Sequence, residues 1–114
     1  MTIDTLIAHC ERRSGVTYDT PFGPGVLVFK VAGKIFALAP LDMFATVNLK
    51  CDPERAIDLR ERYSGIVPGY HMNKRHWNTV DVTGSVPMEL LLELVDHSYE
   101  LVRASLPKKA QAAL

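Results

Sequence analysis

Apolar residues recur every three or four positions in three stretches of the chain, a spacing that aligns them on one face of an α-helix. These stretches cover residues 2–13, 53–64 and 87–105. Asp52 precedes the second stretch in the position of an N-cap, and the charged residues of that stretch are expected to face water. Pro107 ends the third stretch, whose apolar stripe is the widest. We predict three helices, the last of them well buried, followed by a partly frayed tail.

Short runs rich in β-branched and aromatic residues lie between these stretches and indicate strands. Residues 26–31 and 34–39 flank a turn that contains Gly33, which predicts a hairpin. Further strands are expected at 45–49 and at 77–82. Both hairpin runs are apolar at nearly every position, so we expect both faces of the sheet to be at least partly covered.

The last of these strands alternates clearly. Val80 and Val82 point to one face of the sheet, and Thr79 and Asp81 point to the other. Trp77 shares the face of Thr79 and Asp81. Because that face should be covered as well, we expect the indole of Trp77 to pack beneath a helix.

The order of these elements predicts an α+β fold, with an antiparallel β-sheet and packed helices. A chain of 114 residues has the size of a single domain, here residues 1–114. A hydrophobic content of 47% and a charged content of 23% are typical of a soluble globular protein. No apolar run approaches the roughly 20 residues that span a membrane, so no membrane contact is expected.

The two cysteines are far apart in the sequence and belong to no CxxC motif. The first residues lack the basic start and the long apolar centre of a signal peptide, so the expected compartment is the cytoplasm. In that reducing compartment we predict that Cys10 and Cys51 are free, buried thiols.

Charge is distributed unevenly along the chain, although its formal sum is zero. Residues 65–80 contain Lys74 and Arg75 and no acidic residue, whereas residues 81–100 contain acidic residues and no lysine or arginine. Proteins that bind nucleic acid mainly through charge are usually basic overall. Any anion-binding surface on this protein must therefore be a local patch.

Four segments resemble the MmcQ/YjbR family of small bacterial proteins: "VLVFKVAGKIFAL", "NLKCDPERAIDLRERY", "GIVPGYHMNKRHWNTV" and "LVDHSYELVRASLPKK". They span nearly the whole chain in the right order. The resemblance implies a YjbR-like α+β fold with an antiparallel sheet and packed helices, for which a double-wing motif is proposed. It also implies DNA binding, the activity by which the family is commonly labelled.

The segment "GYHMNKRHWNTV", residues 69–80, is the best candidate for a DNA contact. Arginine suits bidentate contacts with phosphate, and lysine supplies a mobile point charge. A few such contacts predict weak, salt-sensitive binding. The candidate residues are Asn73, Lys74, Arg75, His76 and Asn78, with Lys34 and Lys50 as further cations.

Other interpretations of the same segment remain open. One is that the segment serves the fold alone, with His71 as a buried, hydrogen-bonded imidazole. Another is that the chain is a structural or protein-interaction domain that does not bind nucleic acid. A small-molecule or enzymatic site around His71, Lys74 and His76 is a further alternative, but no catalytic motif appears and we expect no enzyme. His71 and His76 lack a third ligand, so we expect no metal and no cofactor. The sequence does not indicate an oligomeric state.

Overall fold

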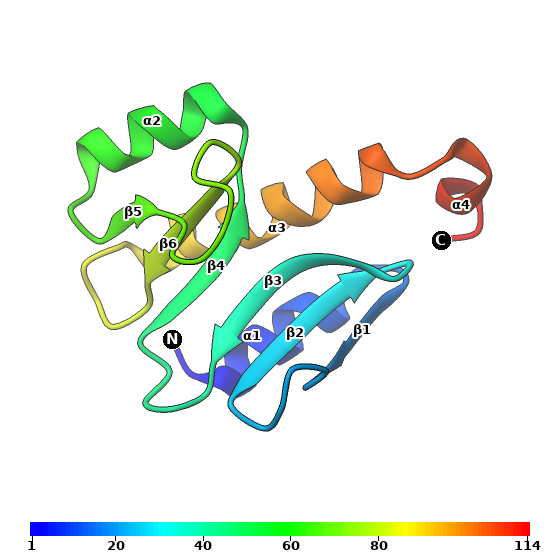
Figure 1. Cartoon of the computed structure of the whole chain (residues 1–114), viewed down its shortest axis with the longest axis horizontal. Helices are drawn as coiled ribbons and strands as arrows, with labels where there is room; N and C mark the ends of the chain where they lie inside the picture. The colour runs from blue at the N-terminus through cyan, green and yellow to red at the C-terminus, as the bar shows by residue number, and fades with distance from the viewer.

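The computed structural model describes residues 1–114 and shows one six-stranded antiparallel sheet with four helices (Figure 1). The order of the strands is β1-β2-β3-β4-β6-β5. The strands are β1 (Val16–Asp19), β2 (Val26–Val31), β3 (Lys34–Pro40), β4 (Thr46–Lys50), β5 (Ile66–Pro68) and β6 (Trp77–Asp81). The helices are α1 (Ile3–Glu11), α2 (Pro53–Arg62), α3 (Met88–Ser105) and α4 (Lys108–Ala112). The α+β class predicted from the sequence is confirmed.

The local signals in the sequence explain the boundaries of the central elements. Asp52 caps α2 by accepting a hydrogen bond from the backbone N–H of Arg55 at 3.1 Å, as its position before Pro53 predicts. The β2–β3 hairpin turns at Ala32 and Gly33, whose φ angles are 48° and 81°. A two-residue turn with both φ angles positive matches the twist of the strands it joins, which fixes the register of this hairpin.

Helices α1, α2 and α3 bury their apolar stripes in a single core on one face of the sheet, and Figure 1 shows α1 and α3 behind the strands. The sheet contributes side chains of alternate positions to this core, among them Val47, Leu49 and Val80. The helices contribute Leu6, Cys10, Ala56, Leu59, Leu91, Leu94, Val95, Tyr99 and Val102. Val80 and Val82 both point into this core, as their alternation predicts.

Ser98 fills a gap in the sheet from the middle of α3. Strands β3 and β4 pair at only two positions, and beyond them the two strands separate. The hydroxyl of Ser98 donates a hydrogen bond to the carbonyl oxygen of Phe36 at 2.5 Å and accepts one from the N–H of Lys50 at 2.9 Å. A buried side chain thus replaces the missing rung of the ladder.

Loops, not helices, cover part of the other face of the sheet. Trp77 lies on this face, where it is the cross-strand partner of Lys50 in β4, and it is not part of the core. Its side chain is half-buried and is not part of the core beneath the helices, so the prediction that it packs beneath a helix is wrong. The alternation of β6 is the reason: because Val80 faces the helices, Trp77 must face away from them.

Three short elements were not predicted. Strand β1 has only one half-buried residue, and β5 has three residues, so neither carries a clear alternating pattern. The chain end was expected to fray, but α4 forms there and Leu114 packs against the core. The side-chain amide of Gln111 holds this end by donating a hydrogen bond to the carbonyl oxygen of Leu106 at 2.8 Å.

Candidate nucleic-acid interface

The loop of residues 69–76 joins β5 to β6 and passes over the open face of the sheet (Figure 1). The N–H of Gly69 donates to the carbonyl oxygen of Trp77 at 2.8 Å, which closes the loop at its base. A Cβ atom at position 69 would lie 2.8 Å from the Cβ of Trp77, so only glycine fits here. Asn73 shapes the tip, because its side-chain oxygen accepts a hydrogen bond from the N–H of Arg75 at 3.0 Å.

Arg60 of α2 connects the helix to this loop through hydrogen bonds. Its guanidinium donates to the side-chain oxygen of Asn78 at 2.7 Å, to the carbonyl oxygen of Trp77 at 3.4 Å and to the carbonyl oxygen of Lys74. All three acceptors are neutral, and Arg60 forms no ion pair. The expectation that the charges of α2 face water is therefore wrong for Arg60, whose positive charge stays uncompensated beside the loop.

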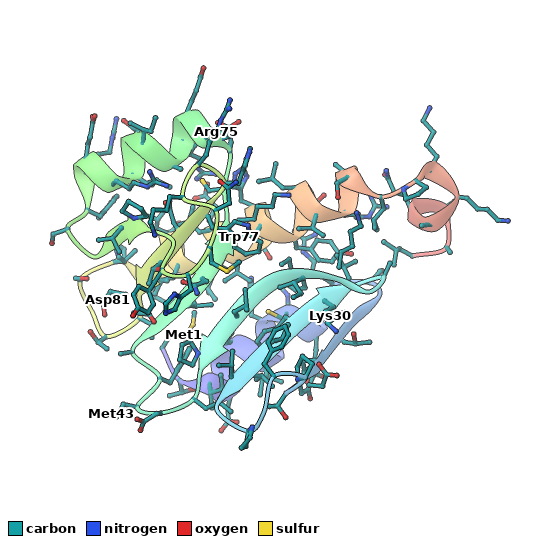
Figure 2. All side chains as sticks on the ribbon, viewed as in Figure 1. Met1, Lys30, Met43, Arg75, Trp77 and Asp81 are labelled. Atoms are coloured by element: carbon teal, nitrogen blue, oxygen red, sulfur yellow. The ribbon has the colours of Figure 1, made fainter.

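A cleft of about 550 Å³ lies between the first turns of α2 and the loop. Arg60, Lys74 and Arg75 line it together with Pro53, Glu54 and Ile57. Three cationic side chains thus face one carboxylate. The ammonium of Lys74 donates to the carbonyl oxygen of Gly69 at 3.0 Å, and neither Lys74 nor Arg75 forms an ion pair. Figure 2 shows Arg75 close to α2 at the edge of the molecule, where its guanidinium can reach solvent.

The structure brings together only part of the residue set that the sequence suggested. Asn73, Lys74, Arg75 and His76 share the loop, and Lys50 lies opposite Trp77 at the loop's end. Asn78 is only 2% exposed and is bonded to Arg60, so its side chain does not reach a base edge; that expectation is corrected.

Lys34 stands apart from this group. It follows the turn between β2 and β3, which Figure 1 shows well separated from the 69–76 loop. The expectation that Lys34 joins the patch is corrected. Arg60 takes its place in the cleft, and no signal in the sequence separated it from the other charged residues of α2.

The two histidines of the loop do not form one site. His71 is exposed rather than buried, adopts a φ of 58° and lies against the ring of Tyr70 with 4.0 Å between ring centroids. His76 is half-buried, and its carbonyl oxygen accepts a hydrogen bond from the N–H of Cys51 at 2.8 Å. His71 and Lys74 line different pockets, so the suggested site around His71, Lys74 and His76 is not assembled. No group of three histidine, cysteine or acidic side chains could hold a metal ion.

Two histidines outside the loop connect α3 to its neighbours, and no sequence pattern predicts either contact. His9 of α1 lies 2.9 Å from Asp96 through its Nε2 atom, while its Nδ1 atom faces the guanidinium of Arg12 at 3.3 Å. The Nε2 atom of His97 accepts a hydrogen bond from the N–H of Asp52 at 3.2 Å, which requires a neutral imidazole. Burial, followed by the nearby guanidinium of Arg55, lowers the pKa of His97.

Both cysteines are free and buried, as predicted. Burial raises the pKa of Cys10 to about 12 and that of Cys51 to about 11. Because the thiolate is the reactive form, neither is a nucleophile at neutral pH.

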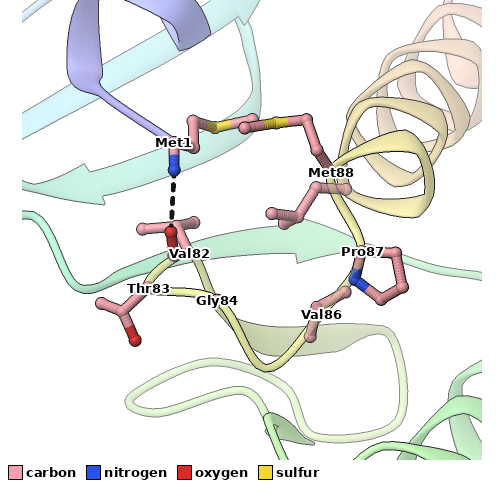
Figure 3. A pocket seen from close by; sticks show the side chains of 8 residues that line it. Met1, Val82, Thr83, Gly84, Val86, Pro87 and Met88 are labelled. Carbon is pink, nitrogen blue, oxygen red and sulfur yellow. Dashed lines mark hydrogen bonds between the residues drawn. The ribbon is translucent and has the colours of Figure 1, made fainter.

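A smaller pocket of about 220 Å³ lies where the segment after β6 meets α3 (Figure 3). Its walls include Met1, Val82 and Met88, and the amino group of Met1 donates to the carbonyl oxygen of Val82 at 3.0 Å. Asp81 holds the adjoining loop by accepting hydrogen bonds from Ser85 and Thr83, which lower the pKa of Asp81 to about 2. No charged side chain lines this pocket, and the amino group of Met1 already donates to a backbone carbonyl oxygen.

None of the helices combines the length and the apolar character required to cross a lipid bilayer.

Comparison with known proteins identifies the relatives of this chain. The model of the YjbR family matches residues 12–101. A protein of Escherichia coli O157:H7 named YbdF is 42% identical over 92 residues, which cover 80% of this chain and 75% of that protein. YjbR of Escherichia coli strain K12 is 33% identical over 115 residues, which cover 100% of this chain and 98% of that protein. Both are described as uncharacterized proteins.

Solved structures share the fold. The crystal structure of Deinococcus radiodurans protein DR2400, described as a DUF419 domain, is 38% identical with a TM-score of 0.93 and covers 98% of this chain and 86% of that one. A Pseudomonas syringae protein is 28% identical with a TM-score of 0.74, over 89% of this chain and 98% of that one. None of these descriptions names a ligand or a reaction, so DNA binding has no support from the relatives.

Proposed function

The chain belongs to the YjbR family, and we propose that it binds the phosphate backbone of DNA, weakly, through the cleft formed by Arg60, Lys74 and Arg75. One observation supports this proposal above the others: three cationic side chains line one cleft, and none of them is paired with a carboxylate. Because no carboxylate compensates their charges, these cations can form charge-assisted hydrogen bonds with phosphate oxygens.

The three side chains have complementary roles in such a contact. Arg60 is held by neutral acceptors, so its charge is fixed in place before a ligand arrives. Arg75 is exposed and offers a planar guanidinium suited to bidentate phosphate contacts. Glu54 lines the same cleft and opposes an anion, so the site is suited to modest affinity.

A role without catalysis is part of the proposal. The cleft is lined by no imidazole, thiol or hydroxyl side chain, so no nucleophile of these kinds lies beside its one carboxylate, Glu54. A cytoplasmic location fits the proposal, since both cysteines are free thiols.

Binding of a labelled DNA duplex to matched variants tests the proposal. Lys74→Ala with Arg75→Ala should weaken binding, and Glu54→Gln should strengthen it. The control, Lys108→Ala with Lys109→Ala, removes the same charge from exposed positions of α4 and should change little. Equal losses of DNA affinity in both double variants would mean that only the net charge matters, and would contradict a specific role of the cleft. If the wild-type protein does not bind DNA even at low salt, a protein-interaction domain is the better explanation.

A further inference from the structure

A second site lies on the open face of the sheet, between the 69–76 loop and the loop that joins β1 to β2. It is a pocket of about 350 Å³ with a mainly apolar lining. Val26 and Leu38 belong to the sheet at this site, and Phe22, Tyr70 and His71 come from the two loops. Phe22 is 68% exposed and Tyr70 is 67% exposed. Ring side chains from two separate loops thus border one hollow on a face that no helix covers.

Among the polar side chains that line this pocket, Asn48 of β4 is held in its orientation by a chain of hydrogen bonds. The N–H of Tyr70 donates to the hydroxyl of Thr79 at 2.9 Å, so that hydroxyl is an acceptor there. The proton of the hydroxyl is then free to be donated to the side-chain oxygen of Asn48, 2.6 Å away. This bond fixes the orientation of the amide and leaves its NH₂ group without a partner in the protein.

The pocket therefore combines flat, polarizable walls with a hydrogen-bond donor. A planar heteroaromatic ring that carries a carbonyl or ring-nitrogen acceptor matches both features, because it stacks on aromatic side chains and accepts from the amide. Nucleobases have this chemistry, and single-stranded nucleic acids present their bases to proteins in this way. In a duplex the bases are paired and stacked, and they reach a pocket only if they are flipped out.

The 69–76 loop links this pocket to the cationic cleft. Tyr70, His71 and Met72 line the pocket, whereas Lys74 and Arg75, only two and three residues after Met72, line the cleft. We propose that the pocket takes one unpaired base of a single-stranded nucleic acid while the cleft holds its phosphates. This inference rests on the phosphate binding proposed above and adds that the preferred ligand is a single strand.

Three probes separate the two sites: a labelled single-stranded oligonucleotide, its duplex, and an abasic single strand of the same length. Tyr70→Ala and Phe22→Ala should each weaken binding of the single strand by roughly 5- to 150-fold, the range for a lost stacking contact, and leave duplex binding unchanged. The abasic strand should bind wild-type protein about as weakly as the normal strand binds Tyr70→Ala. Lys74→Ala with Arg75→Ala should weaken binding of all three probes.

Tyr18→Ala is the matched control, since Tyr18 is also an exposed tyrosine but lies on strand β1, outside the pocket. If the abasic strand binds as well as the normal strand, or if Tyr70→Ala behaves like Tyr18→Ala, the base pocket is refuted and phosphate binding stands. If the aromatic variants lose the single strand but the basic double variant does not, the pocket stands and the cleft is refuted. If no probe binds, both proposals fall.

Discussion

Replacing Ser98 with alanine should destabilise the fold far more than the loss of one oxygen atom suggests. Ser98 is fully buried, and its hydroxyl satisfies the carbonyl oxygen of Phe36 and the N–H of Lys50 where β3 and β4 separate. The substitution leaves both backbone groups without a partner, and each such group costs roughly 1–3 kcal/mol. Alanine returns up to about 0.5 kcal/mol in helix propensity. We expect a net loss of about 1.5–6 kcal/mol, a large part of the stability of a domain this size.

Urea unfolding followed by circular dichroism measures this loss, which should appear as a lower midpoint with an unchanged m-value. Ser105→Ala is the matched control in the same helix, because Ser105 is exposed and its hydroxyl bonds only to the carbonyl oxygen of Val102. It should change the free energy of unfolding by less than about 0.5 kcal/mol. If the two variants unfold at the same urea concentration, Ser98 does not bridge the strands and the reasoning is refuted.

Three further predictions concern other side chains. Trp77→Ala should lower the free energy of unfolding by clearly less than the roughly 3–5 kcal/mol expected of a buried aromatic residue, because Trp77 is half-buried on the open face. A loss of the full amount of about 3–5 kcal/mol in the same urea assay would contradict this placement. Acidification should destabilise the protein as the pH falls below about 6.5, because the fold holds His97 neutral and lowers its pKa. The His97→Gln variant should lose less stability over the same pH range, and identical pH profiles of the two proteins would be evidence against this role. Cys10 and Cys51 should resist alkylation in the native protein and react only after unfolding, and rapid labelling detected by mass spectrometry would show that they are accessible.

The sequence was most informative where a local rule determines the structure. Asp52 before Pro53 defines the start of α2, and Gly33 defines the β2–β3 turn, because capping and positive φ angles depend on neighbouring residues alone. The alternation of Val80 and Val82 also placed β6 correctly relative to the core.

The sequence was least informative where a side chain meets a distant part of the chain. Arg60 resembled the other charges of α2, and only the folded loop shows that it contacts Asn78 and Trp77. The role of Ser98 cannot be predicted either, since nothing local reveals the gap between β3 and β4. The loop that the sequence suggested lines the candidate cleft, but the set of residues changes: Lys34 and Asn78 are excluded and Arg60 is added.

The salt dependence of DNA binding tests phosphate recognition by the cleft most directly. The logarithm of the affinity falls with the logarithm of the salt concentration, with a slope of about −0.9 for each phosphate contact. Contacts from Arg60, Lys74 and Arg75 predict a slope of about −2 to −3 for the wild-type protein. In the Lys74→Ala, Arg75→Ala variant the slope should become shallower by nearly 2, because two contacts are lost. An unchanged slope in that variant would show that the DNA phosphates are bound elsewhere and would contradict the proposed function.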